Sequence, residues 1–235
     1  MSANSSKRSA AVTPAADVDA LIQGAGQGTR LGLGPKAFVS LGEQTLLERV
    51  VATMSAVAGR VIVAVPANDV GRANDLVGGP RVSVIAGGEQ RVETFRKIEA
   101  QSTAPWLILH EVTHPLATVD LAARVLAAAR RVGCAVAAVP NDVSIYGSDG
   151  VLRATPGKAM MLQKPIAFRK DAIGAGLRAI SDVALAENLG VLEILKRGGV
   201  TVEFVLGSSA NFKITTAADL ALACAVALQE RQHPS

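Results

Sequence analysis

The chain of 235 residues has few aromatic side chains and few cysteines. Aromatic residues make up 3% of it, with one Trp and one Tyr. Proteins that bind single-stranded nucleic acid commonly stack bases on aromatic rings, so this scarcity argues against an RNA- or DNA-binding protein. The two cysteines, Cys134 and Cys224, form no CxxC pair. They are therefore interpreted as buried thiols of a cytoplasmic protein, not as a disulfide framework.

Long apolar runs and blocks of like charge are also missing. No apolar run approaches the roughly 20 residues that span a bilayer, so we expect no membrane segment. Residues 1–16 lack a continuous apolar core, which predicts a flexible N-terminal tail and not a signal peptide. The net charge of +4 is spread along the chain. This mild basic excess suits small phosphorylated anions better than nucleic acid.

The apolar residues, 49% of the chain, fall into alternating strand and helix patterns. This rhythm is typical of right-handed βαβ crossovers and a mainly parallel sheet. We expect one α/β domain over residues 17–235. The predicted strands cover residues 18–23, 60–66, 81–86, 105–110, 134–140 and 200–205. The predicted helices cover residues 43–58, 69–77, 89–100, 119–131, a segment from about 170, 185–196 and 216–229.

The alternation breaks at residues 141–165. This segment is polar and rich in turn-forming residues, and Ser148, Asp149 and Gly150 predict a hairpin turn within it. We interpret the segment as an excursion from the main sheet and not as a second domain.

A glycine-rich loop, GAGQGTRLGLGPK at residues 24–36, directly follows the first predicted strand. Glycines let backbone N–H groups approach an anion, and open α/β sheets bind ligands at the carboxyl ends of their strands. Arg30 and Lys36 supply positive charge for a polyphosphate. The glycine spacing does not fit the GxGxxG pattern of dinucleotide-binding folds, and no GK[ST] of a P-loop occurs in the chain.

This loop matches the GxGxRxG…PK signature of nucleotidyltransferases, and four later segments narrow the match. GGEQRVET at 87–94 resembles GGxxRxxS, and LILHEVTHP at 107–115 resembles VLVHDAARP. QKPIAFR at 163–169 resembles QTPQxFR, and NFKITTAADL at 211–220 resembles NIKITTPEDL. Together these segments resemble the 2-C-methyl-D-erythritol 4-phosphate cytidylyltransferase family, collinearly over residues 17–228.

The resemblance implies a three-layer α/β sandwich with a mainly parallel, Rossmann-like sheet and a protruding β-arm. It implies transfer of CMP from CTP to a small phosphorylated alcohol, with release of pyrophosphate and a homodimer formed through residues 141–165. The implied catalytic cations are Arg30, Lys36 and Lys213, and Glu111 is the implied Mg²⁺ ligand. The nucleotide would contact Gly24, Ala25, Gly26, Gly28, Gly88 and Thr94. The acceptor would contact His114, Asp142 and Asp182.

Departures from the family motifs concentrate on the acceptor side. His114 replaces an arginine, Glu111 replaces an aspartate, Ile166 replaces a glutamine, and residues 142–145 read DVSI where the family has DTxK. A neutral imidazole does not replace a permanent bidentate phosphate ligand. Three interpretations therefore stay open: the family's own acceptor, another polyol phosphate or a phosphonate, or a catalytically silent nucleotide-binding homologue.

Overall fold

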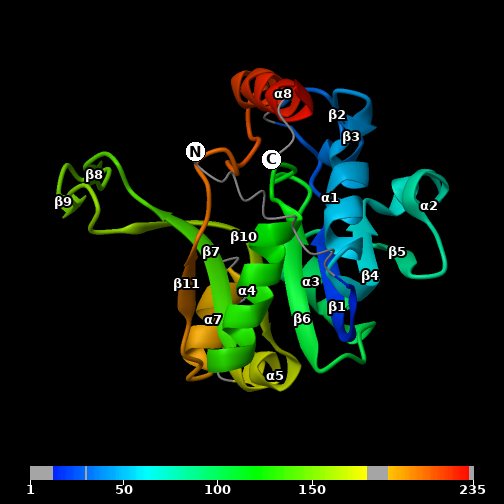
Figure 1. The fold of residues 1–235 in the computed structure, drawn as a ribbon, viewed down its shortest axis with the longest axis horizontal. Coiled ribbons are helices and arrows are strands. Elements are labelled where there is room, and N and C mark those ends of the chain that lie inside the picture. The colour runs from blue at the N-terminus through cyan, green and yellow to red at the C-terminus, as the bar shows by residue number, and fades with distance from the viewer. Residues whose placement is uncertain (1–12, 30, 179–189, 233–235) are drawn as a thin grey trace, which may run out of the picture.

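A seven-stranded sheet forms the centre of the molecule (Figure 1). A computed structural model describes residues 13–29, 31–178 and 190–232. The strand order is β11-β7-β10-β6-β1-β4-β5. Only β10 runs antiparallel to its neighbours, which confirms the prediction of a mainly parallel sheet. The strands are β1 (Ala15–Gln23), β4 (Ala58–Val65), β5 (Val82–Ala86), β6 (Trp106–Glu111), β7 (Cys134–Pro140), β10 (Met160–Arg169) and β11 (Glu203–Leu206).

Helices cover both faces of this sheet, which confirms the three-layer architecture. Alternate residues of one strand face opposite layers: Ala20 and Ile22 belong to one buried core, and Leu21 belongs to the other. The first core is covered by α1 (Leu46–Ser55), α2 (Val70–Val77), α4 (Val119–Val132) and α8 (Ala217–Gln232). The second is covered by α3 (Arg91–Ala100), α5 (Lys170–Arg178) and α7 (Val191–Arg197).

Local sequence signals fix where the longer helices begin and end. Helix α1 starts at a capping box in which the Thr45 hydroxyl accepts from the Glu48 amide, while the Glu48 carboxylate accepts from the Thr45 amide. Helix α4 is capped by Thr118 at its start and ends at Gly133, whose φ of 97° needs a residue without a Cβ. Short elements complete the chain: β2 (Ser40–Leu41), β3 (Gln44–Thr45) and two 3₁₀ turns, η1 (Lys36–Phe38) and η2 (Ala67–Asp69).

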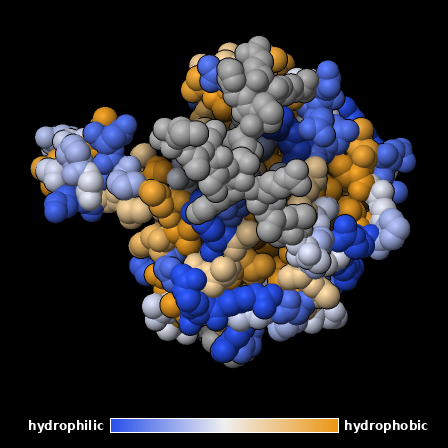
Figure 2. Space-filling view, in the orientation of Figure 1, coloured by the Kyte–Doolittle hydropathy of each residue, from blue (hydrophilic) through white to orange (hydrophobic). Residues whose placement is uncertain are grey.

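A β-arm, residues 141–159, protrudes from the sheet (Figure 1). Its tip is a hairpin of β8 (Ile145–Tyr146) and β9 (Leu152–Ala154), with the predicted turn at residues 148–150 between them. Asn141 closes the base of the arm, because its side chain donates to the Val143 and Thr155 carbonyls and accepts from the Ala159 amide. Figure 2 shows the arm as a separate knob with apolar and polar side chains intermixed.

The structure corrects the sequence interpretation at residues 160–165. The sequence pattern assigns these residues to the excursion, but they form the first part of β10, which lies in the middle of the main sheet. Pro165 and the register shift between Leu162 and Ile166 hide the strand from pattern analysis, because proline is disfavoured in central strands. The first strand also starts earlier than expected, at Ala15. No helix in the described ranges is long and apolar enough to cross a membrane.

Candidate active site

Two adjoining cavities open at the edge where the parallel strands end. Strand β1 ends at Gln23 and its neighbour β6 ends at Glu111, and these two residues are partners in the β1–β6 register. The first cavity, of about 320 Å³, lies over the glycine-rich loop. The second, of about 390 Å³, lies toward β10 and α7. Arg91, Glu111 and Lys213 line both cavities, so these side chains form their common boundary.

The glycine-rich loop is folded tightly against itself. Gly28 has a φ of 68°, and a Cβ placed there would lie 2.1 Å from the Gly34 carbonyl oxygen. Only glycine fits this position. The Lys36 amide closes the loop by donating to the Gly26 carbonyl oxygen at 3.3 Å. The Gly24 amide donates a hydrogen bond to the Ala64 carbonyl oxygen of β4 at 2.7 Å. Gly24 does not line the cavity, whereas Ala25, Gly26 and Gly28 do.

The Lys36 side chain joins this loop to the segment that carries Lys213. Its Nζ donates to the Ile214 carbonyl at 3.0 Å, and the lysine is 7% exposed. The Ile214 amide in turn donates to the Thr113 carbonyl just after β6. The segment then enters α8 through a capping pair, in which Asp219 accepts from the Thr215 and Thr216 amides. Lys213 is therefore held beside β6 by contacts on both sides.

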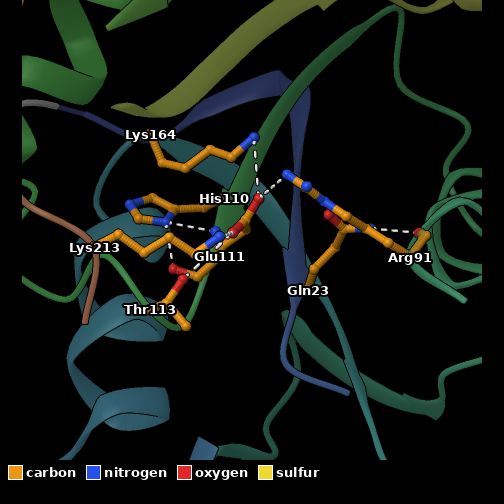
Figure 3. Close-up of polar contacts among 7 residues, drawn as sticks. All are labelled: Gln23, Arg91, His110, Glu111, Thr113, Lys164 and Lys213. Atoms are coloured by element: carbon orange, nitrogen blue, oxygen red, sulfur yellow. Dashed lines mark hydrogen bonds and ion pairs between the residues drawn. The ribbon is translucent and has the colours of Figure 1, made fainter. Parts of the chain in front are cut away.

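Glu111 is the centre of the charged cluster (Figure 3). Its Oε1 lies 2.5 Å from Arg91 Nη2 and 3.4 Å from Lys164 Nζ. Its Oε2 accepts from Lys213 Nζ at 3.0 Å and from Thr113 Oγ1 at 3.3 Å. One buried carboxylate thus holds three cations from three different parts of the chain, and the cluster carries a net positive charge.

These cations determine the ionisation of Glu111. Burial alone would raise the pKa of its carboxyl group, but Lys164, Arg91 and Lys213 together hold that pKa well below its ordinary value of 4.5. Glu111 is therefore a carboxylate at neutral pH. Burial also lowers the pKa of Lys164 from 10.5, while the Glu111 carboxylate acts to raise it.

Strand β10 brings Lys164 to this cluster because it runs antiparallel to β6. Ile166 pairs with Leu109, and two residues further along each strand Lys164 meets Glu111. The backbone carbonyl of Lys164 accepts from Asn211 Nδ2 at 2.7 Å. Gln163 Nε2 donates to the Ser208 carbonyl, also at 2.7 Å. The segment that precedes Lys213 is thereby fastened to the strand that carries Lys164.

Two buried histidines lie behind the cluster, with ring centroids 6.5 Å apart. Burial lowers the pKa of His110 to about 4. Burial first, and then the neighbouring His110, lowers the pKa of His114 to about 3. Both imidazoles are therefore neutral at physiological pH. His114 lines the second cavity, but it brings no positive charge there.

The loop before α3 closes the far side of the first cavity. Thr94 is 3% exposed, and its Oγ1 accepts from the Gly88 amide at 2.9 Å. Gly88 and Thr94 both line the cavity, together with Arg91. The Thr94 hydroxyl thus stabilises the conformation of this loop, and the Gly88 backbone faces the cavity.

The predicted site residues fall into three groups. Most lie together at the two cavities: Ala25, Gly26, Gly28, Lys36, Gly88, Thr94, Glu111, His114 and Lys213. Gly24 lies behind the loop, and Asp142 is exposed at the base of the β-arm and lines neither cavity. Arg30 and Asp182 lie outside the described residues.

Sequence reasoning missed two cations, Arg91 and Lys164. Both lie in segments that resemble family motifs, Arg91 in GGEQRVET at 87–94 and Lys164 in QKPIAFR at 163–169. The lysine at the second position of QKPI, where the related motif has threonine, was the available signal. Lys164 and Glu111 are far apart in the sequence, so the sequence alone does not show that the sheet brings them into contact.

Comparison with known proteins identifies the family. Residues 18–229 match the family described as IspD: 2-C-methyl-D-erythritol 4-phosphate cytidylyltransferase. A relative of that name from Thermus thermophilus is 35% identical over 222 residues, which are 90% of this chain and 97% of the relative. One from Deinococcus radiodurans is 34% identical over 209 residues, 87% of each chain.

Solved structures agree with this assignment. The crystal structure of 2-C-methyl-D-erythritol 4-phosphate cytidylyltransferase from Thermus thermophilus superposes with a TM-score of 0.74 at 28% identity. The superposition covers 90% of this chain and 98% of that one. The family is one of cytidylyltransferases that generally use a divalent metal. The chain belongs to the 2-C-methyl-D-erythritol 4-phosphate cytidylyltransferase family.

Proposed function

We propose that this protein transfers CMP from CTP to 2-C-methyl-D-erythritol 4-phosphate, a step of non-mevalonate isoprenoid synthesis. The observation that carries the proposal is the pair of adjoining cavities with a common cationic boundary of Arg91 and Lys213. A reaction between two phosphate groups needs both reactants to meet where positive charge is concentrated. Membership of the family supplies the nature of the two substrates.

In the first cavity, CTP lies over the glycine-rich loop. Backbone groups of Gly26 and Gly28 border its phosphates, and the Gly88 backbone borders the base. Lys36 and Lys213 lie beside the triphosphate, and Arg30 joins them in the proposed scheme. Lys213 is 42% exposed at its side chain, so it can turn from Glu111 to a phosphate with little change in burial.

The chemical step is a displacement at the α-phosphorus. An oxygen of the acceptor phosphate forms a bond to that phosphorus, the bond from it to the β-phosphate oxygen breaks, and pyrophosphate leaves with the bonding electron pair. The attacking phosphate is mostly dianionic at pH 7, because its second pKa is about 6. No general base is required, which suits a site whose histidines are buried at its back. Lys213 and Lys36 balance the charge that builds up around the α-phosphate.

A divalent metal fits this site only together with the nucleotide. The described residues hold no cluster of three or more His, Cys, Asp or Glu side chains. Glu111 presents one carboxylate at the cavity boundary, with both oxygens paired to cations. Mg²⁺ in nucleotide enzymes is commonly held by one or two carboxylates plus substrate phosphates, so Glu111 is the residue that would face it. The ion would supply charge neutralisation on the phosphates.

The proposed enzyme is a homodimer held through the β-arm. The arm and the adjoining part of β10 expose apolar side chains to solvent, which favours a partner surface. Their exposed fractions are 62% for Tyr146, 50% for Val151, 45% for Leu152 and 42% for Met161. Its substrates are small water-soluble phosphates and its cysteines are free thiols, so we infer a cytoplasmic location.

The test is release of pyrophosphate from CTP and Mg²⁺ in the presence of 2-C-methyl-D-erythritol 4-phosphate. The proposal predicts release that requires both substrates. A panel of other polyol phosphates and phosphonates belongs in the same assay, because His114 leaves the second cavity without the arginine of the family motif. Release with a panel member and none with the family's acceptor would replace the proposed acceptor. Silence with every acceptor, beside measurable CTP binding, would overturn the proposed activity.

A further inference from the structure

Lys164 is a buried cation, and none of the roles predicted from the sequence involves it. Its side chain is 8% exposed, and it lines the second cavity. Its ammonium pairs with Glu111 Oε1, at 3.4 Å. An ammonium carries three N–H donors, so Lys164 can keep Glu111 and still donate to a ligand in the cavity. A little-exposed cation that lines a cavity points to an anionic group of a ligand there.

The charges around Lys164 favour an anionic ligand. Arg91, Lys164 and Lys213 all line the second cavity, against one carboxylate, Glu111. Glu111 already pairs with all three, so the excess positive charge remains for an incoming group. The rest of the lining is largely apolar and includes Val139, Leu162, Ile166, Val191 and Leu192. This lining favours a molecule with one charged end and one carbon-rich end, oriented with its anionic group at the cationic boundary.

His114 does not compete for this role. It faces the same cavity, but burial and the neighbouring His110 lower its pKa to about 3, so it is uncharged at neutral pH. The arginine that the family motif has at this position would be permanently charged. The positive charge missing at His114 is supplied from β10, by the lysine that stands where the motif QTPQ has threonine.

We propose that Lys164 binds the phosphate or phosphonate group of the acceptor and holds it beside the α-phosphate of CTP. The inference deepens the proposed function and rests on it. Asn211 and Gln163 join β10 to the segment that carries Lys213, through bonds of 2.7 Å to the Lys164 and Ser208 carbonyls. Lys164 on the acceptor side and Lys213 at the boundary therefore belong to one hydrogen-bonded unit.

The direct test is binding of small anions by calorimetry. The probes are inorganic phosphate, methylphosphonate and 2-C-methyl-D-erythritol 4-phosphate, each added to protein saturated with a CTP analogue that has a methylene between its α- and β-phosphorus atoms. Lys164→Met removes the charge and keeps the length of the chain. We expect it to weaken binding of each probe about 10- to 100-fold, the range for a hydrogen bond to a charged group. Lys164→Arg should retain most of the affinity.

Two further variants serve as comparisons. Lys196→Met removes a lysine that is exposed at the end of α7 and lines neither cavity, so it should bind all probes as the wild type does. Lys164→Thr installs the family's own residue and should lose anion affinity as Lys164→Met does. Affinity for the CTP analogue alone should stay within about twofold in every variant, because Lys164 does not line the first cavity.

Kinetics separate this inference from the proposed function. The KM for the acceptor should rise in Lys164→Met while the KM for CTP stays unchanged. Wild-type anion affinity in both Lys164→Met and Lys164→Thr would overturn the role of Lys164, and so would an equal loss of CTP affinity. Lys164-dependent anion binding without pyrophosphate release would support the site and overturn the proposed activity alone.

Discussion

Lys213 Nζ lies 3.0 Å from Glu111 Oε2 at the boundary of the two cavities, although the residues are 102 positions apart in the chain. The lysine side chain is 42% exposed and the glutamate 8%. The glutamate thus holds a half-exposed cation at the boundary where we propose that the two phosphates meet. In the proposed reaction, Lys213 exchanges Glu111 for a phosphate oxygen of the nucleotide.

Replacing Lys213 with Met should lower kcat by about 100- to 1000-fold, as loss of one group that stabilises the transition-state charge typically does. The urea midpoint of unfolding should change little, because the side chain is half-exposed and a solvent-exposed ion pair contributes little to the free energy of unfolding. Steady-state pyrophosphate release and urea denaturation measure the two effects. A wild-type kcat would remove Lys213 from the reaction.

Lys36 should behave differently from Lys213. Its ammonium is buried and donates to the Ile214 carbonyl, so Lys36→Met should cost stability as well as turnover. We expect a loss of about 1–3 kcal/mol in the free energy of unfolding, the cost of leaving a buried acceptor unpaired. Urea titration of the two lysine variants side by side is the measurement. Equal stability of Lys36→Met and wild type would contradict the structural role of Lys36.

Changes at Glu111 test both the cation cluster and the metal. Glu111→Gln leaves three cations without their carboxylate and should destabilise the fold by about 1–3 kcal/mol. That is less than for a fully buried pair, because Arg91 and Lys213 are each 42% exposed. Glu111→Asp should keep Mg²⁺-dependent turnover, and calorimetry should show Mg²⁺ binding only with CTP present. If Asp and Ala at this position behave alike, Glu111 does not face the metal.

The two buried histidines predict how stability depends on pH. Their pKa values in the folded protein are about 4 for His110 and about 3 for His114, below the ordinary 6.5. Below pH 6.5 the unfolded chain therefore binds more protons than the folded one, so stability should fall as the pH drops from 6.5 toward 4. Urea titrations at several pH values should show a shallower fall for His114→Gln. Identical slopes would mean that His114 is not buried in its neutral form.

The β-arm should control the oligomeric state. Light scattering is expected to give twice the chain mass of 24.1 kDa for the wild type. Tyr146→Asp combined with Leu152→Asp should give the monomer mass, because charge is introduced at two exposed apolar positions of the arm. Leu222→Asp changes a leucine of α8 that is 56% exposed and serves as the matched control. A monomeric wild type would contradict the dimer.

The sequence predicts most of the sheet because its parallel strands are short and apolar and alternate with helices. Residues 134–140 form β7 as predicted, and the helix expected at 119–131 is α4, Val119–Val132. Cys134 is buried as expected, whereas Cys224 is only half-buried. Strand β10 escaped detection because Pro165 interrupts it and Met160, Met161 and Leu162 are all exposed. Its register with β6 is a tertiary property that no local pattern encodes.

The same limit explains which parts of the site could be predicted. The glycine-rich loop, Lys36 and Lys213 lie in compact motifs whose spacing carries the chemistry. Lys164 and Glu111 meet only because an antiparallel strand enters a parallel sheet beside β6. The neutral state of His114 depends on burial and on His110, which the spacing of the two residues does not reveal.

The most direct test of the proposed activity is pyrophosphate release by the wild-type protein with CTP, Mg²⁺ and 2-C-methyl-D-erythritol 4-phosphate. We expect release that depends on both substrates and is nearly abolished in Lys213→Met. Absence of release under these conditions, with the protein folded and CTP bound, would contradict it.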